Sequence, residues 1–481
     1  MKLSVSSLQH GFYKPNALTA SIRHALILST TLLSVNVAVA DIVIDDDNIG
    51  GGGTNTITAP TPFTAAADIT DTSGPAIRIN DTNGANGLLT INGGVTVSSS
   101  SAEAVILDGG GATSVSITNA GTLSSVLNGL LVQNAAELTA FNNTGGIIES
   151  TGAASAGLYL QEDQNSAITN AGIIRNTSSG DALRIDTESQ TQDFINSGTI
   201  SSTSGTAINA DTAMTGSTNG FNNTGSIIGG GGTAIDAEAA FKLTNSGTIT
   251  GNIDHATSGA LTITQTAGSI GGNITSTANA AHSLSLTGGS ITGNITFNGT
   301  TANNFLLNGT TINGSVDLGD GAAHTVTLTT GSISGSLDIG ANTTAVSINT
   351  GGGDSVTVAT LDSLNATVNM TGAGTFNSTT FNNNSTVNQS AGTMTIGTYH
   401  NNGTVTRSAG NLAITTLNNT GALSGFGGTA LDATAALTIN NSGTGSITGD
   451  INHATAGALT INHSGGSIAG NITSSTGALT I

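Results

Sequence analysis

The triplet Gly353-Asp354-Ser355 places a carboxylate next to a hydroxyl, as in one serine-protease motif. Val356 follows it where that motif has a small residue, and no distinctive histidine region accompanies it. Such triplets are expected by chance in a chain with 68 glycines, and a catalytic triad is defined by geometry rather than by adjacent letters. We therefore predict no catalytic residue here.

Asp317 and Asp338 are 21 residues apart and would lie about 5 Å from each other if their segments stack as neighbouring β-strands. That separation suits the paired carboxylates of a retaining glycosidase, and Asp320 could complete a weak Ca²⁺ site. The simpler interpretation is a pair of solvated carboxylates, because the repeat has no aromatic residue nearby to hold a sugar. We favour that interpretation, place Ca²⁺ second and hydrolysis third, and predict no metal ligand.

The histidines do not form a metal-ligand cluster in the predicted arrangement. His282 and His324 share a register, but Asn303 occupies it between them, so the rings lie about 10 Å apart at two strand spacings. One metal ion needs its ligands at about 2.1 Å. His255 and His453 belong to two copies of one duplicated segment and carry no independent signal.

The composition excludes several classes of function. Only 7% of the 481 residues are charged and 3% are aromatic, and there is no cysteine or tryptophan. So few aromatic residues leave little for a cofactor pocket or a base-stacking surface. The glycine runs at 50–53 and 229–232 lack the Lys-Ser/Thr of a phosphate-binding loop. We predict no cofactor and no disulfide framework.

The elements that would position these residues follow a 21-residue repeat. Leading isoleucines recur at that interval at positions 249, 270, 291, 312 and 333, and a second aliphatic ladder follows four residues later, at 253, 274, 295, 316 and 337. Because side chains alternate along a strand, the two ladders are predicted to share a face. Upstream aliphatic pairs such as Leu284 and Leu286 then lie beyond a bend, which Thr287-Gly288-Gly289 supplies. Each unit buries its apolar side only by stacking on the next.

A related motif continues toward the N-terminus with looser spacing. Its asparagines, at 119, 143, 170, 196, 223 and 245, are 22 to 27 residues apart, which indicates variable loops on a constant coil. Asparagine and glycine at fixed places suit positive φ angles, and stacked asparagines can form hydrogen-bonded ladders. Residues 417–481 nearly repeat 221–284, which indicates an internal duplication.

These patterns predict an all-β fold, a parallel β-solenoid of roughly 20 coils with about 21–27 residues per coil. The prolines after the leader, at 60, 62 and 75, all precede the repeats, as expected because proline cannot donate to a strand ladder. We assign 41–80 to an N-terminal cap and 81–481 to the repetitive region.

Residues 1–40 are predicted to be a secretory signal peptide. They combine Lys2, Lys14 and Arg23 with an apolar run from Ala25 to Val37 and end in Ala38-Val39-Ala40. The run is too short and too polar to cross a membrane of about 30 Å. Beyond it, five basic and 28 acidic residues leave a net charge of −23. Such a chain cannot neutralise phosphates, so nucleic acid is disfavoured as a partner.

Motifs such as FNNTGSI (221–227) and LTNSGTI (243–249), the long leader and the absence of cysteine resemble the passenger of a bacterial autotransporter, the type V secretion system. The resemblance covers nearly all of the chain after the leader. It implies a right-handed parallel β-helix, export to the outer membrane or cell surface or secretion, and a C-terminal translocator β-barrel. The alternating barrel strands with aromatic girdles are not in this sequence, so we expect them beyond Ile481.

We therefore expect a non-enzymatic rod that is displayed on the surface or secreted and acts in adhesion or self-association, or binds a surface glycan or protein receptor. Many weak hydrogen-bonding sites on one rod would act multivalently. The alternatives are a polysaccharide-acting enzyme with its site in a groove of the coils, and a structural spacer that presents another domain.

Overall fold

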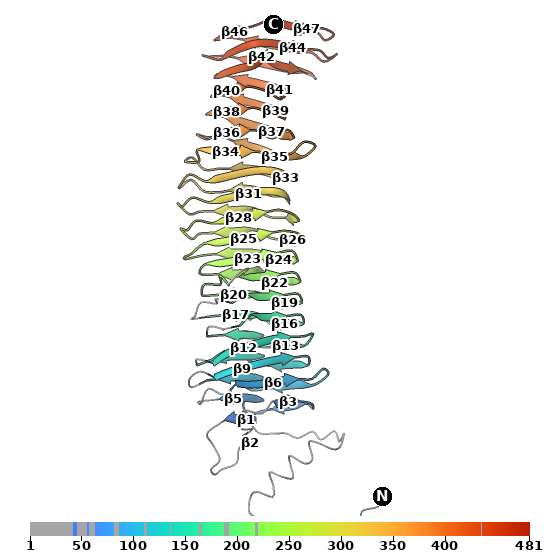
Figure 1. Cartoon of the computed structure of the whole chain (residues 1–481), viewed down its shortest axis with the longest axis vertical. Helices are drawn as coiled ribbons and strands as arrows, with labels where there is room; N and C mark the ends of the chain where they lie inside the picture. The colour runs from blue at the N-terminus through green and yellow to red at the C-terminus, as the bar shows by residue number, and fades with distance from the viewer. Residues whose placement is uncertain are drawn as a thin grey trace, which may run out of the picture. The chain divides into compact units, whose positions relative to one another are not determined.

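The computed structural model describes residues 42–45, 55–56, 63–80, 86–109, 113–134, 136–162, 166–186, 192–216, 220–433 and 435–481. It separates Met1–Val37 from Ala38–Ile481, and all of the described residues belong to the second unit. The predicted signal peptide, residues 1–40, lies outside the described residues. Within them the chain is all-β, with 48 strands in one parallel sheet that winds through about 18 turns (Figure 1).

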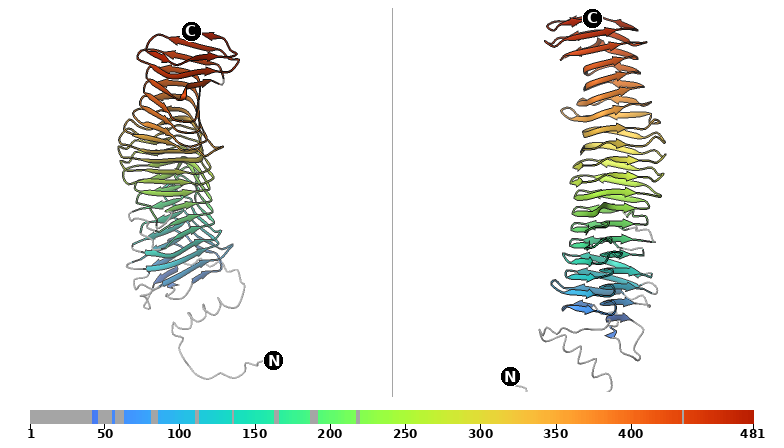
Figure 2. Two further views of the ribbon diagram at one scale, coloured as in Figure 1. Left: turned by 45° about the horizontal axis from the view of Figure 1, so that its top comes forward. Right: turned by 180° about the vertical axis from the view of Figure 1, so that it is seen from behind.

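Each turn passes through three faces, which we number in chain order and which Figure 2 shows from behind and in a tilted view. The strands confined to the first face are β3 (Phe63–Ala65), β6 (Asn86–Ile91), β9 (Thr113–Asn119), β12 (Ala136–Asn143), β15 (Ile168–Asn170), β18 (Phe194–Asn196), β21 (Phe221–Asn223), β23 (Phe241–Asn245), β25 (Leu261–Gln265), β28 (Ser283–Leu286), β34 (Ala345–Ile348), β36 (Thr367–Met370), β38 (Thr386–Gln389), β40 (Thr404–Arg407) and β46 (Ser467–Ala469).

The strands confined to the second face are β4 (Ile69–Asp71), β7 (Thr96–Ser99), β10 (Thr122–Ser125), β13 (Ile147–Ser150), β16 (Ile173–Asn176), β19 (Thr199–Ser202), β26 (Ser269–Ile270), β29 (Ser290–Ile291) and β47 (Ile472–Ser474). The strands confined to the third face are β1 (Ile42–Asp45) with its partner β2 (Asn55–Thr56), β5 (Ile77–Asn80), β8 (Val105–Asp108), β11 (Leu130–Gln133), β14 (Leu158–Leu160), β17 (Leu183–Ile185), β20 (Ile208–Ala210), β27 (Ile274–Ser276), β30 (Ile295–Phe297), β32 (Val316–Asp317), β43 (Leu437–Asn441), β45 (Leu459–His463) and β48 (Leu479–Thr480).

Ten longer strands continue around a corner from one face to the next, and β33 turns two corners. They are β22 (Ser226–Ala237), β24 (Thr248–His255), β31 (Asn304–Ile312), β33 (Thr325–Asp338), β35 (Ser355–Asp362), β37 (Thr375–Asn383), β39 (Thr393–Asn401), β41 (Asn411–Asn419), β42 (Ala422–Ala433) and β44 (Ser446–His453).

This architecture confirms the predicted parallel β-helix and its stacked aliphatic ladders. Ile249 pairs in register with Ile270, and the same register continues to Ile291 and onward through the repeat. Alternate side chains point inward and form one apolar core that extends from Ala65 to Ile461. Because each coil buries its apolar residues only against its neighbours, stacking rather than any single coil creates this core.

The side chains of both aliphatic ladders point into the core, as their predicted shared side requires, but the two ladders belong to different faces of the column. Ile249 belongs to the second face and Ile253 to the third, and Gly251 between them has a φ of +119°. Gly251, in the left-handed conformation, turns the corner inside β24, so that the side chains of Ile249 and Ile253 both point into the core. The predicted bend at Gly288-Gly289 is confirmed, with a φ of +76° at Gly289.

Coil length varies more than the sequence predicts. Hydrogen-bonded neighbours on adjacent coils are 28 residues apart near Asn128 and Ala156, but 18 apart between Asn383, Asn401 and Asn419. The predicted lower limit of 21 residues is therefore wrong for the coils between Thr375 and Asn419. In these coils β37, β39 and β41 pass from the second face to the third without a loop.

The repeated asparagines form the predicted ladder. From Asn119 to Asn245 each side-chain amide donates to the next asparagine oxygen at 2.7–2.9 Å, and Gln265 accepts the last bond. A second ladder joins Asn383, Asn401, Asn419 and Asn441 at 2.7 Å. Every one of these asparagines is fully buried.

The explanation by positive φ is wrong for these asparagines and for most glycines of the motif. Among the described residues other than glycine, positive φ occurs only at Asn134, Thr257 and Leu364. At Gly198 a Cβ would lie 2.0 Å from the carbonyl oxygen of Gly172 on the preceding coil. Close approach of neighbouring backbones, rather than a left-handed conformation, thus requires glycine at this corner.

The duplicated segment is displaced by one face around the column. Phe221 lies on the first face, whereas its copy Leu417 lies on the third. The second asparagine ladder accordingly follows a different edge of the column from the first. The coils before residue 417 are only 18 residues long, so the duplicated segment starts on a different face from the original segment.

The part of the predicted cap that is described, within 41–80, already pairs with the following coils, since β3 lies in register with β6 and β5 with β8. A search of the described residues for a helix long and apolar enough to span a membrane finds none.

Candidate functional site

The triplet Gly353-Asp354-Ser355 lies in the exposed turn that leads into β35. The Asp354 backbone N–H closes this turn on the carbonyl oxygen of Gly351 at 3.0 Å. Among the described residues no histidine is hydrogen-bonded to the Asp354 or Ser355 side chain. The arrangement needed for a nucleophile and its base is not assembled there.

Asp317 and Asp338 are in register on adjacent coils, as predicted, and Asp362 extends the column by one coil. Each carboxylate accepts a backbone N–H two residues later, from Gly319 at 2.8 Å, Gly340 at 3.0 Å and Leu364 at 2.9 Å. These are Asx turns, which hold the corner after the strand. The sequence period missed Asp362 because its coil is longer than 21 residues.

Asp320 does not join Asp317. Its carboxylate accepts the backbone N–H of Ala341 on the next coil at 3.2 Å. Within the described part of the chain, no group of three or more histidine, aspartate or glutamate side chains is arranged to hold a metal ion.

His282, Asn303 and His324 occupy one buried register, as predicted. His282 Nδ1 accepts the N–H of Leu261 at 3.0 Å, Asn303 Oδ1 accepts the N–H of His282 at 2.9 Å, and His324 Nδ1 accepts the N–H of Asn303 at 2.9 Å. Each side chain thereby satisfies a backbone donor of the neighbouring coil. Their role is structural.

His255 and His282 are joined through a buried hydroxyl. Ser276 Oγ lies 2.8 Å from His255 Nδ1 and 3.1 Å from His282 Nε2. Because His282 Nδ1 accepts a backbone N–H, its proton is on Nε2, which also lies 3.2 Å from the carbonyl oxygen of Ala278. Burial lowers the pKa of both histidines, which favours the neutral form of each ring.

A cluster that the sequence analysis did not single out lies on the third face. Tyr159 donates from its hydroxyl to Asp186, Arg184 Nε lies 3.0 and 3.1 Å from the two Asp186 carboxylate oxygens, and Arg184 Nη2 lies 3.4 Å from Asp211. The Arg184 guanidinium also lies 5.2 Å from the centre of the Tyr159 ring. Burial, together with the neighbouring Asp186, raises the pKa of Asp211 to about 6.

Most of the charged residues in one outward register of the third face are acidic. This register includes Tyr159 and Arg184 of the cluster described above and continues through β35. Its members are Tyr159, Arg184, Asn209, Asp236, Asp254, Thr275, Thr296, Asp317, Asp338 and Asp362. Burial, then the charges of Glu238 and Asp254, raise the pKa of Asp236.

The first face is different. Over eight coils, from β25 to β40, its outward side chains form two parallel columns without a charge, after Lys242 on the preceding coil. These residues are Thr262, Thr264, Ser283, Ser285, Asn304, Leu306, Thr325, Thr327, Ala345, Ser347, Thr367, Asn369, Thr386, Asn388, Thr404 and Thr406. Strand stacking places successive members of a column about 4.8 Å apart.

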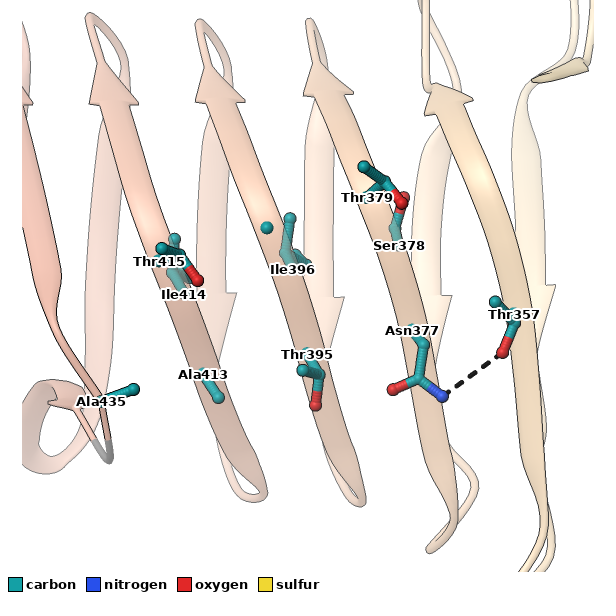
Figure 3. A pocket seen from close by; sticks show the side chains of 11 residues that line it. Thr357, Asn377, Ser378, Thr379, Thr395, Ile396, Ala413, Ile414, Thr415 and Ala435 are labelled. Carbon is teal, nitrogen blue, oxygen red and sulfur yellow. Dashed lines mark hydrogen bonds between the residues drawn. The ribbon is translucent and has the colours of Figure 1, made fainter. Parts of the chain in front are cut away.

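A recess of about 410 Å³ crosses the short coils at the second face (Figure 3). Thr357, Asn377, Thr395 and Ala413 follow one another along it, and Asn377 Nδ2 donates to Thr357 Oγ1 at 3.4 Å. β41 pairs with β43 only through its later half, so the stacking is interrupted beyond Ala413 and leaves this hollow. None of the residues lining the recess is charged.

Comparison of the chain with protein-family models, with curated proteins and with solved structures finds no match.

Proposed function

We propose that this protein is an exported, non-catalytic rod for self-association and adhesion, and that copies meet through the uncharged first face between β25 and β40. The observation that carries this proposal is the pair of neutral columns over eight consecutive coils. Their hydroxyl and amide groups repeat at a fixed spacing. Two such faces can form many weak hydrogen bonds at once, which act multivalently.

Electrostatics favours this face over the third. After the predicted leader the chain carries a net charge of −23. Two copies that met through their third faces would bring Asp236, Asp254 and the Asp317 column against like charges, which is unfavourable. The first face brings together no like charges between Thr262 and Thr406, so close approach costs less there than at the third face.

Export and surface display rest on the sequence. The basic leader, the apolar run and the Ala38-Val39-Ala40 exit support export, and the passenger-like motifs support an autotransporter route to the outer membrane, with surface display or secretion. A β-helix without cysteine is compatible with that route. A translocator barrel is the partner that this part of the proposal requires.

Paired charges on two different faces test the proposed contact. Thr327→Asp with Ser347→Asp places two carboxylates in register on the first face, and Thr275→Asp with Thr296→Asp places two in register on the third. Both double variants change the net charge equally. We expect the first variant to weaken self-association at least tenfold in sedimentation velocity and to reduce clumping of cells that display the protein, and the second to have a much smaller effect.

Equal effects of the two variants would refute the first face as the contact. A wild-type protein that stays monomeric at all concentrations, and whose display neither clumps cells nor attaches them to surfaces, would refute the proposed function itself.

A further inference from the structure

The recess on the short coils is a trough that crosses the strands and runs along the column (Figure 3). One of its walls is an outward register of four consecutive coils, made of Thr357, Asn377, Thr395 and Ala413. Three steps of about 4.8 Å make this wall about 14 Å long. The trough, with a volume of about 410 Å³, has room for a stretch of a linear chain molecule that lies parallel to the column axis.

The floor of the trough is mainly aliphatic. Ile396 and Ile414 are buried members of the lining, and the buried Ser378 between the same walls donates its hydroxyl to the carbonyl oxygen of Thr380 at 2.8 Å. The strands β35, β37 and β39 beneath them are each paired with a strand on both sides. A molecule on this floor therefore meets aliphatic carbon rather than free backbone donors.

The rim of the trough carries hydroxyl groups that are available to a ligand. Thr379, Thr395 and Thr415 are exposed, and within the described part of the chain none of their hydroxyls has a hydrogen-bond partner. The Asn377 amide makes one long side-chain contact, to Thr357 at 3.4 Å. A hydroxyl both donates and accepts, and an amide offers a donor and an acceptor. The rim is thus complementary to a molecule whose own polar groups are hydroxyls.

We propose that this trough binds a neutral, linear polysaccharide chain, with the sugar rings on the aliphatic floor and their hydroxyls at the threonine rim. The inference deepens the proposed adhesion, and its biological role rests on that proposal.

Charge and backbone pairing disfavour other linear chains. None of the lining residues is charged, and the protein carries a net charge of −23 after the leader, so it repels an anionic chain such as nucleic acid. An extended peptide that adds to a sheet needs a strand edge with unpaired backbone groups. The strands β35, β37 and β39 offer no such edge, because both of their sides are paired.

The affinity for one short chain is expected to be low. No aromatic residue lines the trough, so a sugar ring packs only on aliphatic groups, and we expect a Kd of about 1 mM. Many rods displayed side by side would bind one polymer multivalently.

Methyl NMR of the full chain, labelled at isoleucine and alanine, tests the site with cellotetraose, a straight, neutral chain of β-1,4-linked glucose. We expect the methyl resonances of Ile396, Ile414 and Ala413 to shift with a midpoint at about 1 mM. The resonance of Ile249, in the core of a distant coil, should stay unchanged. Tetragalacturonate, which is linear but anionic, should bind several-fold more weakly.

Matched substitutions separate the trough from the rest of the surface. Ala413→Gln extends a neutral side chain into the trough and should weaken cellotetraose binding at least about tenfold. Ala345→Gln makes the same change on the exposed side of β34, on the first face, and should leave binding unchanged. Thr395→Val removes a rim hydroxyl but keeps the shape of the side chain, and should weaken binding about threefold.

Several results would overturn the inference. They are the absence of any shift at about 20 mM cellotetraose, equal binding by Ala413→Gln and the wild type, and tighter binding of tetragalacturonate than of cellotetraose. None of these results bears on self-association, which sedimentation measures without any glycan. Failure of this site and failure of the proposed self-association are therefore distinguishable.

Discussion

A single asparagine inside the first ladder is hydrogen-bonded to asparagine side chains on both neighbouring coils. Asn196 accepts from Asn170 and donates to Asn223, both at 2.7 Å. Asn196→Ala leaves a buried donor and a buried acceptor unsatisfied, so we expect the free energy of unfolding to fall by about 2–4 kcal/mol in urea titrations followed by circular dichroism. Asn222→Ala, on the solvent side of the next coil, is the control and should change it by less than about 0.5 kcal/mol.

An equal loss in both variants would show that strand propensity, rather than the buried ladder, determines the loss of stability.

The ladder also has a defined start. Asn119 Oδ1 is buried without a partner because Ile91 occupies the same register on the preceding coil. An apolar neighbour therefore limits how far the hydrogen-bonded column can extend.

The buried histidine pair predicts loss of stability in mild acid. Burial lowers the pKa of His282, so the unfolded chain takes up a proton before the folded one as pH falls below about 6.5. The stability contribution is complete above that value and declines below it. His282→Asn should reduce this decline, because an asparagine at the equivalent place, Asn303, already accepts the same kind of backbone N–H at 2.9 Å.

The measurement is the urea midpoint of wild type and His282→Asn at pH 7.5, 6 and 5. At pH 7.5 the free energy of unfolding of the variant should lie within about 1 kcal/mol of that of the wild type. An acid response that is identical in both proteins would assign the titration to other groups.

At the scale of the element, the corner between two strands determines where glycine is required. A Cβ at Gly198 would lie 2.0 Å from the Gly172 carbonyl oxygen, whereas at Gly352 it would meet no atom within 4 Å, and Gly352 does not have a positive φ. Gly198→Ala forces neighbouring coils apart and is expected to cost at least about 2 kcal/mol. Gly352→Ala should be neutral or slightly stabilising.

Thermal unfolding followed by circular dichroism compares the two variants directly. Equal melting temperatures would mean that the coils adjust to the added methyl group, and would remove close backbone approach as the reason for glycine at this corner.

Elements with a constant repeat are the part of the fold that the sequence predicts best. The 21-residue interval places Ile249, Ile270 and Ile291 in one register because the loops between them have equal length. Register cannot be counted where loop length changes. Asp186 and Asp211 come from coils of another length, so the sequence does not reveal that Arg184 contacts both carboxylates. Asp362 escaped notice for the same reason.

Physical context also decided the role of residues that were predicted correctly in position. Asp317 and Asp338 share a register, yet each carboxylate is occupied by the backbone of its own turn. His282 and His324 likewise serve backbone donors. Residue type and spacing identified these positions, but the hydrogen bonds that define their roles depend on corner geometry, which a repeat period does not contain.

At the scale of the whole molecule, charge is distributed unequally around the column. The acidic register lies on the third face, and the first face is uncharged over eight coils. Copies of a chain with a net charge of −23 repel each other at long range even when their contact surface is neutral. Ionic strength therefore separates a neutral contact from an ionic one.

If copies associate through the first face, added salt screens the overall repulsion and leaves the contact itself intact. The Debye length falls from about 10 Å at 0.1 M to about 3 Å at 1 M ionic strength. We expect the association constant from sedimentation equilibrium to rise roughly several-fold between about 0.05 and about 0.5 M NaCl. The double variant Thr275→Asp with Thr296→Asp should show a steeper rise, because each copy of it carries more negative charge. An association that weakens with salt would instead indicate that ion pairs form the contact.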